Sequence, residues 1–449
     1  MKVFLVSCYI LCYFTSIVAQ PFPSGSRVCF VGNSITNNGE FHHNILLYHL
    51  TRYPKENVSF FNCGISGDVT SGILSRMDDD ILVHQPTHIV LMIGMNDVKR
   101  SLYGEHAINN TDTLSQRQNA IVVYKKNLEK IVNLFLSKKL AIILQKPTIY
   151  DQTAKLPTKN NLGVNDALKE CAYFIGELAA KYQLQVVDYW TILNKLNQQL
   201  QQNDSSATLT SKDRVHPQST GHLIMAYQFL TAVKASKYVS EIAVSKEGTI
   251  QSSINCELLK TDKKKNTYSF FIREKSLPFP ILNQQEFALE LVPFQKDFNQ
   301  EIFKITNLPE GNYALSIDTT FIGNFNAEDL KAGINLATYN TTPQYQQSLA
   351  LRNVLVELWK QESNLRSIKF IEYNGDFKKC IDKSSVEAIK AYLTPVFKAK
   401  NNDFYMVQLD KYFLNKPLEK QLIDLSVELR EKAYQIAQPV LHVYNLVKN

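Results

Sequence analysis

Three residues in two short stretches of this sequence have the chemistry needed to cleave an ester. Ser34 follows an apolar run and a glycine in FVGNSIT, at residues 30–36, and His216 lies in DRVHP, at residues 213–217. A serine hydroxyl is a weak nucleophile and needs a base within hydrogen-bonding reach, and a histidine base needs an acceptor that holds its tautomer. Asp213, three residues before His216, can supply that acceptor. We therefore expect Ser34 as nucleophile, His216 as base and Asp213 as its partner.

Acyl transfer also needs fixed hydrogen-bond donors, because its tetrahedral intermediate carries an oxyanion. Gly67, in NCGISGD at residues 62–68, would let a backbone N–H approach closely. Asn96, in GMND at residues 94–97, offers a side-chain amide, and the N–H of Ser34 is a third donor. Each residue alone has an ordinary explanation as a turn or cap residue. Their combination is what indicates a catalytic site.

Short apolar segments alternate with helical patterns between residues 27 and 236. The pattern predicts strands at residues 28–31, 58–61, 88–93, 140–144 and 185–187, and helices at residues 41–53, 71–83, 120–136, 162–182 and 221–233. Nearly all-apolar strands separated by helices indicate a parallel sheet that is covered on both faces. We therefore expect a doubly wound α/β fold, a three-layer α/β/α sandwich with five parallel strands. In such folds, functional residues gather beyond the carboxyl ends of the strands, where the four stretches above are placed.

The pattern changes after about residue 237, and 449 residues exceed what one hydrophobic core usually fills. The second region is predicted to contain strands at residues 267–272, 288–292, 313–317 and 321–325, then helices at residues 349–365, 385–397 and 418–436. We predict a boundary near residue 240, with a catalytic domain at residues 27–236 and a mixed β-then-α region at residues 240–449.

The first 19 residues are typical of a cleavable signal peptide. A lysine precedes an apolar stretch at residues 3–18, and Ala19 offers a small residue at the cleavage point. A membrane anchor is the alternative, but the stretch is short for a span and no later segment approaches spanning length. The sequence therefore predicts a secreted or periplasmic protein without a stable membrane span.

Cysteine and charge content exclude other classes. Cleavage would leave five scattered cysteines: Cys29, Cys63, Cys171, Cys256 and Cys380. An odd, widely spaced set without a CxxC motif predicts buried thiols rather than a disulfide framework or a zinc site, although one pair could still bridge. The formal charge of +7 is modest for this length, and no dense basic patch indicates a nucleic-acid partner. The lysines at residues 263–265 fit the tip of a polar hairpin.

The four stretches together resemble the conserved blocks of the SGNH hydrolases, also called the GDSL-type esterase and lipase superfamily. The resemblance covers roughly residues 27–236 and implies a flavodoxin-like fold and a triad of Ser34, His216 and Asp213. It also implies an oxyanion hole formed by the N–H groups of Ser34 and Gly67 and the side chain of Asn96, with no metal or organic cofactor. Residues 308–337 and 342–367 further resemble the C-terminal tail of a bacterial group of exported members.

One position departs from the family pattern, which usually has aspartate where this chain has Asn33. That carboxylate transfers no proton in the mechanism. Asparagine keeps a similar shape and its own hydrogen bonds, and it removes one negative charge beside the nucleophile. We expect catalysis to survive the change.

Other polar residues are expected to have lesser roles. Asp188 ends a predicted strand and is a rival to Asp213 as the triad acid, although no histidine is near it in sequence. We expect the aspartates at residues 78–80 to lie on a solvated face and His222 to pack. Helix-surface positions are expected for His42, His43 and His49, of which the first two could instead line the mouth of the site. Tyr339, Tyr345 and Trp359 are expected in the core, with a substrate cleft or glycan surface as the alternative.

These patterns predict an exported serine esterase that works through an acyl-enzyme intermediate. An O-acetyl or other O-acyl carbohydrate is the expected substrate, because the protein is predicted to be exported and resembles this family. The alternatives are a lysophospholipase-type acylhydrolase, which would need an extended apolar groove, and a catalytically silent glycan-binding protein. The expected partner is a small-molecule or glycan ester.

Overall fold

A five-stranded parallel sheet forms the centre of the first half of the protein. The computed structural model describes residues 21–104 and 111–449, so the predicted signal peptide lies outside the described residues. The strands are β1 (Arg27–Gly32), β2 (Ser59–Gly64), β3 (His88–Met92), β4 (Ala141–Lys146) and β5 (Gln185–Asp188). They pair in parallel in the order β2-β1-β3-β4-β5. The expected α/β sheet is confirmed, and its order is the flavodoxin-like one, with the topological switch between β1 and β3.

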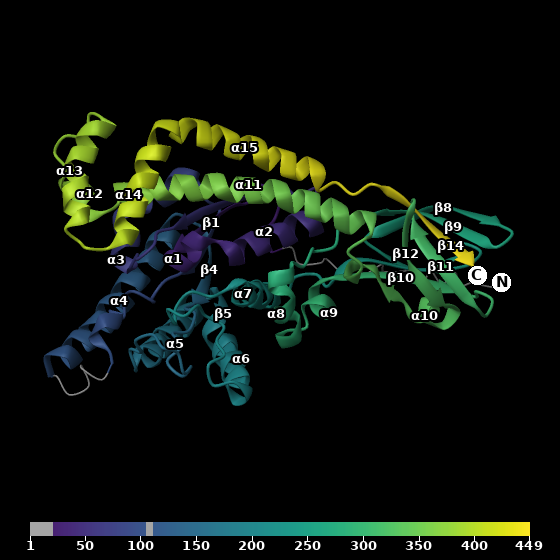
Figure 1. Cartoon of the computed structure of the whole chain (residues 1–449), viewed down its shortest axis with the longest axis horizontal. Coiled ribbons are helices and arrows are strands. Elements are labelled where there is room, and N and C mark those ends of the chain that lie inside the picture. The colour runs from purple at the N-terminus through teal and green to yellow at the C-terminus, as the bar shows by residue number, and fades with distance from the viewer. Residues whose placement is uncertain (1–20, 105–110) are drawn as a thin grey trace, which may run out of the picture.

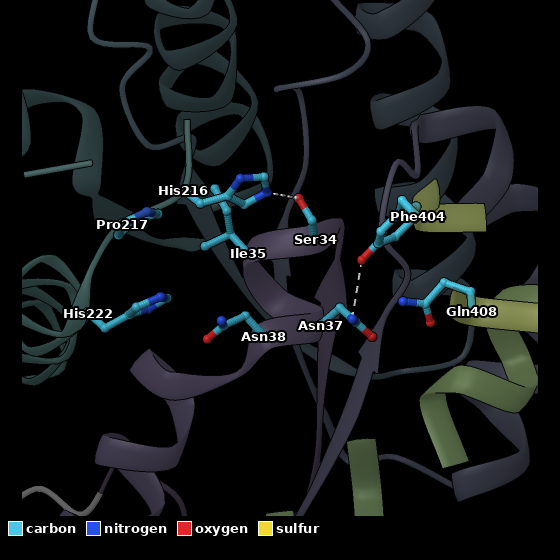
Figure 2. Close-up of a pocket in the computed structure, with 10 residues that line it drawn as sticks. Ser34, Ile35, Asn37, Asn38, His216, Pro217, His222, Phe404 and Gln408 are labelled. Carbon is cyan, nitrogen blue, oxygen red and sulfur yellow. Dashed lines mark hydrogen bonds between the residues drawn. The ribbon is translucent and has the colours of Figure 1, made fainter. Parts of the chain in front are cut away.

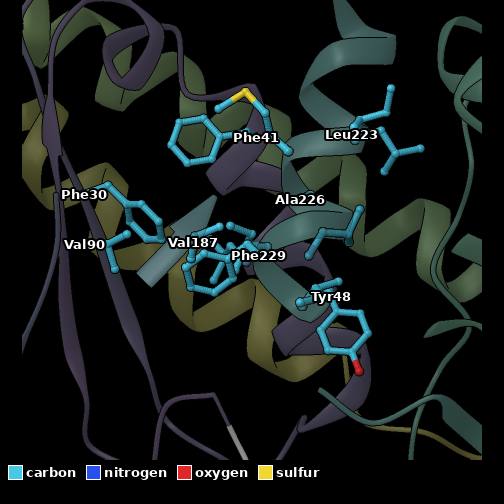
Figure 3. Packing of buried hydrophobic residues seen from close by; sticks show 14 of the residues in the cluster. Phe30, Phe41, Tyr48, Val90, Val187, Leu223, Ala226 and Phe229 are labelled. Carbon is cyan, nitrogen blue, oxygen red and sulfur yellow. The ribbon is translucent and has the colours of Figure 1, made fainter. Parts of the chain in front are cut away.

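Helices cover both faces of this sheet. They are α1 (Ser34–Asn38), α2 (Glu40–Arg52), α3 (Thr70–Arg76), α4 (Thr111–Ser137), α5 (Val164–Tyr182), α6 (Tyr189–Asn203) and α7 (Ser219–Ala232). Successive residues of a strand face opposite sides. Phe30 therefore packs with α2 and α7 (Figure 3), whereas its neighbour Val31 packs with α3, α4 and α5. Both cores are fully buried, which confirms the three-layer sandwich.

The second region contains two further sheets. Its strands are β6 (Tyr238–Ser245), β7 (Ile250–Ile254), β8 (Cys256–Lys264), β9 (Thr267–Glu274), β10 (Gln300–Thr306), β11 (Asn312–Ile317), β12 (Thr320–Asn326), β13 (Ile334–Asn335) and β14 (Leu441–Lys448). One sheet has the order β13-β10-β6-β7, and the other has the order β12-β11-β14-β9-β8. The chain thus returns at its end to place β14 between β11 and β9. The lysines at residues 263–265 lie at the turn of the β8–β9 hairpin, as expected.

The helices of this region are α8 (Glu286–Leu291), α9 (Phe294–Phe298), α10 (Ala327–Ala332), α11 (Pro343–Glu372), α12 (Gly375–Lys379), α13 (Val386–Lys398), α14 (Asp403–Asn415) and α15 (Glu419–Ile436). The strand predicted at residues 288–292 is wrong, because most of that segment lies in α8. Alanine, leucine and glutamate there favour a helix, and within α8 only Ala288 is buried. A strand packed on a core would bury alternate residues instead.

The long helix α11 joins the two halves of the molecule. It packs beside α15 and contacts α2 and β2 of the first half. Figure 1 shows α11 and α15 running between the two C-terminal sheets at one end and the group α12–α14 at the other. At the seam, the Tyr434 hydroxyl of α15 accepts a hydrogen bond from the Val58 N–H at 2.7 Å and donates one to the Val58 carbonyl at 2.8 Å. The second region therefore packs along the side of the first half and is not attached to it by the chain connection alone.

All five cysteines in the described ranges are free and buried, as expected. The same ranges contain no helix that is both long enough and apolar enough to cross a membrane.

Candidate active site

Ser34 lies at the point where β1 gives way to α1. The side-chain oxygen of Asn33 accepts the Ile35 N–H at 3.2 Å, and the Asn33 carbonyl accepts the Asn37 N–H at 2.8 Å. Asn33 is thus the N-cap of α1, a position that asparagine fills as well as aspartate does. Ser34 is the first residue of this helix, so its own N–H has no intrahelical acceptor. The local fold therefore presents both the hydroxyl and a free N–H of Ser34 at the sheet edge.

Ser34, His216 and Asp213 form a continuous hydrogen-bonded chain. Ser34 Oγ lies 2.7 Å from His216 Nε2 (Figure 2), and His216 Nδ1 lies 2.5 Å from Asp213 Oδ2. An ionised carboxylate can only accept, so Nδ1 carries the proton and Nε2 accepts from the serine hydroxyl. The structure therefore brings together the three residues that the sequence indicated, in the tautomer that a base requires.

The second oxygen of Asp213 is held by its own loop. Oδ1 accepts hydrogen bonds from Ser211 Oγ at 2.6 Å, from the Val215 N–H at 2.9 Å and from the His216 N–H at 3.0 Å. Partial burial raises the pKa of this carboxyl, but hydrogen bonds from His216, Ser211 and the backbone outweigh it and hold the pKa well below its usual range. Asp213 is consequently a fixed anion beside the imidazole.

Arg214 anchors this loop, a role that sequence reasoning missed. Its buried guanidinium donates to the carbonyls of Asp151, Ala154, Leu156 and Thr158, at 2.9 to 3.1 Å. Its backbone has a φ of 68°, in the left-handed region. No spacing in the sequence marks four distant carbonyls as the partners of one arginine.

Gly67 and Asn96 present donors near the same edge of the sheet. Gly67 has a φ of +82°, which favours glycine, and its N–H has no backbone acceptor within the described ranges. The Asn96 amide donates one hydrogen to the Asp68 carbonyl at 3.0 Å, and its oxygen accepts from Arg100 at 2.9 Å. These two bonds fix the orientation of the amide, and its second hydrogen has no acceptor among residues 21–104 and 111–449.

Asp188, the rival acid, is committed elsewhere. Its Oδ1 caps α6 by accepting the Thr191 N–H at 2.9 Å, and its Oδ2 pairs with Lys146 at 2.5 Å. The helix α6 that it caps was not predicted, although Leu193, Leu196 and Leu200 recur at helical spacing. Asp188 therefore acts as a cap, and Asp213 is the carboxylate that meets His216.

The helix-surface role expected for His42 and His49 is wrong, because both are buried, and His43 is partly buried. His42 is 2% exposed, with Nε2 at 3.1 Å from the Thr36 carbonyl, and burial lowers its pKa to about 4. His43 stacks on Trp359 of α11, with ring centroids 4.2 Å apart. Burial also lowers the pKa of His49 to about 4 and that of His222 to about 3. His42, His43 and His222 lie close together where α2 faces α7 and α11, and His49 packs against Tyr53 and Phe60.

A cavity of about 250 Å³ opens beside the Ser34 hydroxyl. It is lined by Ser34, Ile35, Asn37, Asn38, Ser66, His216, Pro217, His222, Phe404 and Gln408 (Figure 2). The last two residues come from α14, so the second region forms one wall of the cavity. Tyr339, Tyr345 and Trp359 do not line it: Tyr345 is buried and the other two are partly buried against the core. The structure thus supports their expected core role and assigns the wall to residues that the sequence did not mark.

The expectation that the aspartates at residues 78–80 are solvated holds for Asp78 and Asp79 but is wrong for Asp80. Asp80 is 2% exposed and pairs with Arg76 and Arg366. Within residues 21–104 and 111–449, no group of three or more His, Cys, Asp or Glu side chains is placed to hold a metal ion.

Comparison with known proteins identifies the family and several similar proteins. Residues 28–229 match the model of the GDSL-like lipase/acylhydrolase family. The structure resembles that of a gut microbial diltiazem-metabolizing enzyme, with 30% identity, coverage of 96% of this chain and 99% of that one, and a TM-score of 0.86. An acetylxylan esterase of Geobacillus stearothermophilus is 22% identical over 225 residues, which are 47% of this chain and 94% of that protein. A crystal structure of an acetylxylan esterase from the same organism is 23% identical over 48% of this chain and 96% of that one, with a TM-score of 0.39.

The chain belongs to the GDSL-like lipase/acylhydrolase family of the SGNH hydrolase superfamily. It is accordingly a hydrolase that acts on carboxylic ester bonds.

Proposed function

We propose that Ser34, His216 and Asp213 are the catalytic triad of this esterase and that Ser34 N–H, Gly67 N–H and the Asn96 amide form its oxyanion hole. The observation that carries this proposal is the chain of two hydrogen bonds, 2.7 Å and 2.5 Å long, that runs from Ser34 through His216 to Asp213. It supplies a base within reach of the nucleophile and an anion that holds the base in the required tautomer.

The reaction then proceeds in two half-reactions. Ser34 Oγ attacks the ester carbonyl carbon while its proton passes to His216 Nε2, and Asp213 stabilises the imidazolium. The oxyanion accepts hydrogen bonds from Ser34, Gly67 and Asn96, and its collapse breaks the bond to the alcohol oxygen, which takes the proton from Nε2. Water, deprotonated by His216, attacks the acyl-serine in the same way, and the carboxylic acid and free Ser34 are released.

The substrate class that best fits is an ester of a short acyl group, above all an O-acetyl group, on a carbohydrate. The cavity beside Ser34 is small, and asparagine, serine, histidine and glutamine side chains share its lining with a few apolar ones. A long acyl chain would need an extended apolar groove, so these features do not favour the lysophospholipase alternative. Similarity to an acetylxylan esterase supports the carbohydrate assignment. The catalytically silent alternative has no support, because the chain belongs to a family of hydrolases.

A matrix of esters tests the proposal, with the acyl group varied on one alcohol and the alcohol varied on one acyl group. p-Nitrophenyl acetate, butyrate, octanoate and palmitate form the first series, and acetylated xylo-oligosaccharides, diltiazem (an acetate ester) and ethyl acetate form the second. A lysophospholipid is assayed separately as a long-chain ester. We expect kcat/KM to fall steadily beyond butyrate and to be highest, among the natural-type alcohols, for the acetylated sugars. A maximum at octanoate or with the lysophospholipid would overturn the substrate assignment, and hydrolysis restricted to diltiazem would replace the sugar by a non-glycan alcohol.

We also propose that the protein is exported. The support is the signal-like pattern of residues 1–19, in which a lysine and an apolar stretch precede Ala19. Expression of the full chain in a bacterial host with N-terminal sequencing of the product is the test. A mature protein that begins at Gln20 supports export, and an intact Met1 in the cytoplasmic fraction contradicts it.

A further inference from the structure

Four charged side chains form a buried series of ion pairs between α11 and the loop that follows β2. Arg366 of α11 donates from its two terminal nitrogens to the carboxylate of Asp80, at 2.7 and 2.9 Å. Asp80 also pairs with Arg76, and Arg76 pairs with Asp68 at 2.9 Å. Each of the four side chains is less than one-tenth exposed. The second region is thus connected to residues next to Gly67 through charges that water barely reaches.

The two arginines also hold the ends of two strands of the central sheet. Arg366 Nε donates to the Gly64 carbonyl at 3.0 Å, and Arg76 donates to the Gly32 carbonyl at 3.4 Å. Gly64 is the last residue of β2 and Gly32 is the last residue of β1. These carbonyls lie directly before the two segments that carry Gly67 and Ser34.

Asp68 connects this series to the third oxyanion donor. Its carboxylate accepts from Arg76 and from the Val69 N–H at 2.9 Å, so the residue is held on both sides. Its carbonyl accepts the Asn96 amide at 3.0 Å. A displacement of Asp68 would therefore move the Gly67 N–H, which precedes it in the chain, and release the Asn96 amide.

Stability alone is a weak explanation for such a series. The attraction within a buried ion pair offsets little more than the free energy of removing both charges from water. Well-packed apolar side chains of similar volume often stabilise a protein as much or more. What the bidentate guanidinium–carboxylate pair supplies is a fixed geometry. An oxyanion hole depends on that kind of precision, because its donors act only at about 2.7–3.1 Å from the developing charge.

We propose that Arg366 is a positioning residue for the oxyanion hole, acting through Gly64 and through Asp80, Arg76 and Asp68. The second region then contributes to catalysis by holding the oxyanion donors in position. The inference rests on the proposed function, because it takes Gly67 and Asn96 as donors to the oxyanion.

A double-mutant cycle tests the proposal. Arg366→Met, Asn96→Ala and the double variant are compared with the wild type, using kcat and KM for p-nitrophenyl acetate. We expect Arg366→Met to lower kcat about tenfold or more, with KM within about threefold of the wild type, since it disturbs donors that act in the transition state. In the Asn96→Ala background, the same replacement should lower kcat by a clearly smaller factor, because one of the donors that it misplaces is already gone while the Gly67 N–H remains. An equal cost in both backgrounds would overturn the proposal.

Lys369→Met is the matched control. Lys369 lies one turn further along α11 and pairs with Glu372 at 2.9 Å and with Glu419 at 3.3 Å, both within the second region. Its replacement removes ion pairs from the same helix without touching the ends of β1 or β2. We expect a lower melting temperature with kcat unchanged, and a loss of kcat equal to that of Arg366→Met would show a general structural effect instead.

Arg366→Lys keeps the proposal testable if Arg366→Met does not fold. Lysine keeps the charge but cannot hold both Asp80 oxygens and the Gly64 carbonyl at once, so kcat should fall by an intermediate factor and the cycle with Asn96→Ala should again be non-additive. The two levels of the argument fail separately. A wild type without esterase activity, or an undiminished Ser34→Ala variant, refutes the proposed function. An active wild type with an additive cycle refutes only the role of Arg366.

Discussion

Replacement of Asp213 by asparagine should inactivate the enzyme by reversing the histidine tautomer. Asp213 Oδ1 accepts three hydrogen bonds, from Ser211 Oγ and from the N–H groups of Val215 and His216. An asparagine that placed its NH2 group there would lose the two bonds from backbone N–H groups, at about 1 kcal/mol each, because only the Ser211 hydroxyl can rotate and accept. The amide oxygen is therefore favoured at that position by about thirtyfold, and the NH2 group faces the imidazole.

An NH2 group that faces His216 Nδ1 can only donate, so Nδ1 must become the unprotonated nitrogen. The proton then resides on Nε2, which points at Ser34 Oγ and can no longer accept its proton. Loss of the correct tautomer in a triad of this kind costs about 10⁴-fold in kcat, or about 5.5 kcal/mol. We expect the kcat of the Asp213→Asn variant to fall by about this factor, with KM changed little.

The assay is steady-state hydrolysis of p-nitrophenyl acetate by wild type, Asp213→Asn and Asp188→Asn. Asp188 is the control because it is the other carboxylate that the sequence offered as the triad acid, yet it ends β5, caps α6 and pairs with Lys146. Its replacement should lower stability and leave kcat near that of the wild type. Retention of more than a tenth of wild-type kcat by Asp213→Asn, or a collapse of kcat in Asp188→Asn, would refute the reasoning.

Three further predictions address the donors, the cavity wall and the buried charge. Arg100→Met removes the 2.9 Å hydrogen bond that orients the Asn96 amide, so kcat should fall about tenfold with KM unchanged; steady-state kinetics check this, and an unaltered kcat contradicts it. Phe404→Ala should raise KM severalfold for acetylated xylo-oligosaccharides but not for ethyl acetate, because Phe404 lines the cavity. Val407→Ala is its control, since Val407 is exposed on the same helix outside the cavity, and equal effects of the two variants would count against a wall role. Burial raises the pKa of Glu362 from 4.5 to about 7. Between these pH values the folded protein binds more protons at this carboxyl than the unfolded chain does, so the free energy of unfolding decreases as pH rises through this range. The free energy of unfolding of Glu362→Gln, measured in urea relative to the wild type, should therefore be about 3 kcal/mol higher at pH 8 than at pH 4. A difference between the two proteins that does not change with pH would refute this prediction.

The central sheet and the approximate positions of its strands could be predicted from sequence because the information is local. Four-residue apolar runs such as residues 28–31, bounded by turns and helices, indicate a buried parallel strand regardless of distant contacts. The residues after these strands could also be placed at one edge, because parallel strands all end on the same side of a sheet. A serine nucleophile needs a base and a histidine base needs an acceptor, and these requirements then singled out His216 as the partner of Ser34 and Asp213 as the partner of His216.

The contributions of the second region could not be predicted, because they depend on contacts between residues far apart in the chain. Asp80 belongs to an acidic run that is typical of a solvated face, and its buried pairing includes Arg366, which lies 286 residues later in the chain. The wall formed by α14 has the same origin, since nothing local places Phe404 beside Ser34. The error at residues 288–292 is different: it arose from an apolar segment too short for its periodicity to separate strand from helix.

The identity of the nucleophile is tested most directly by the site of covalent labelling. The purified protein would be treated with a fluorophosphonate, digested and mapped by peptide mass spectrometry, with hydrolysis of p-nitrophenyl acetate followed in parallel. We predict a single adduct on Ser34 whose extent matches the loss of activity, and no adduct in Ser34→Ala. Full inactivation with the adduct on another residue, or full activity after complete labelling of Ser34, would contradict the account.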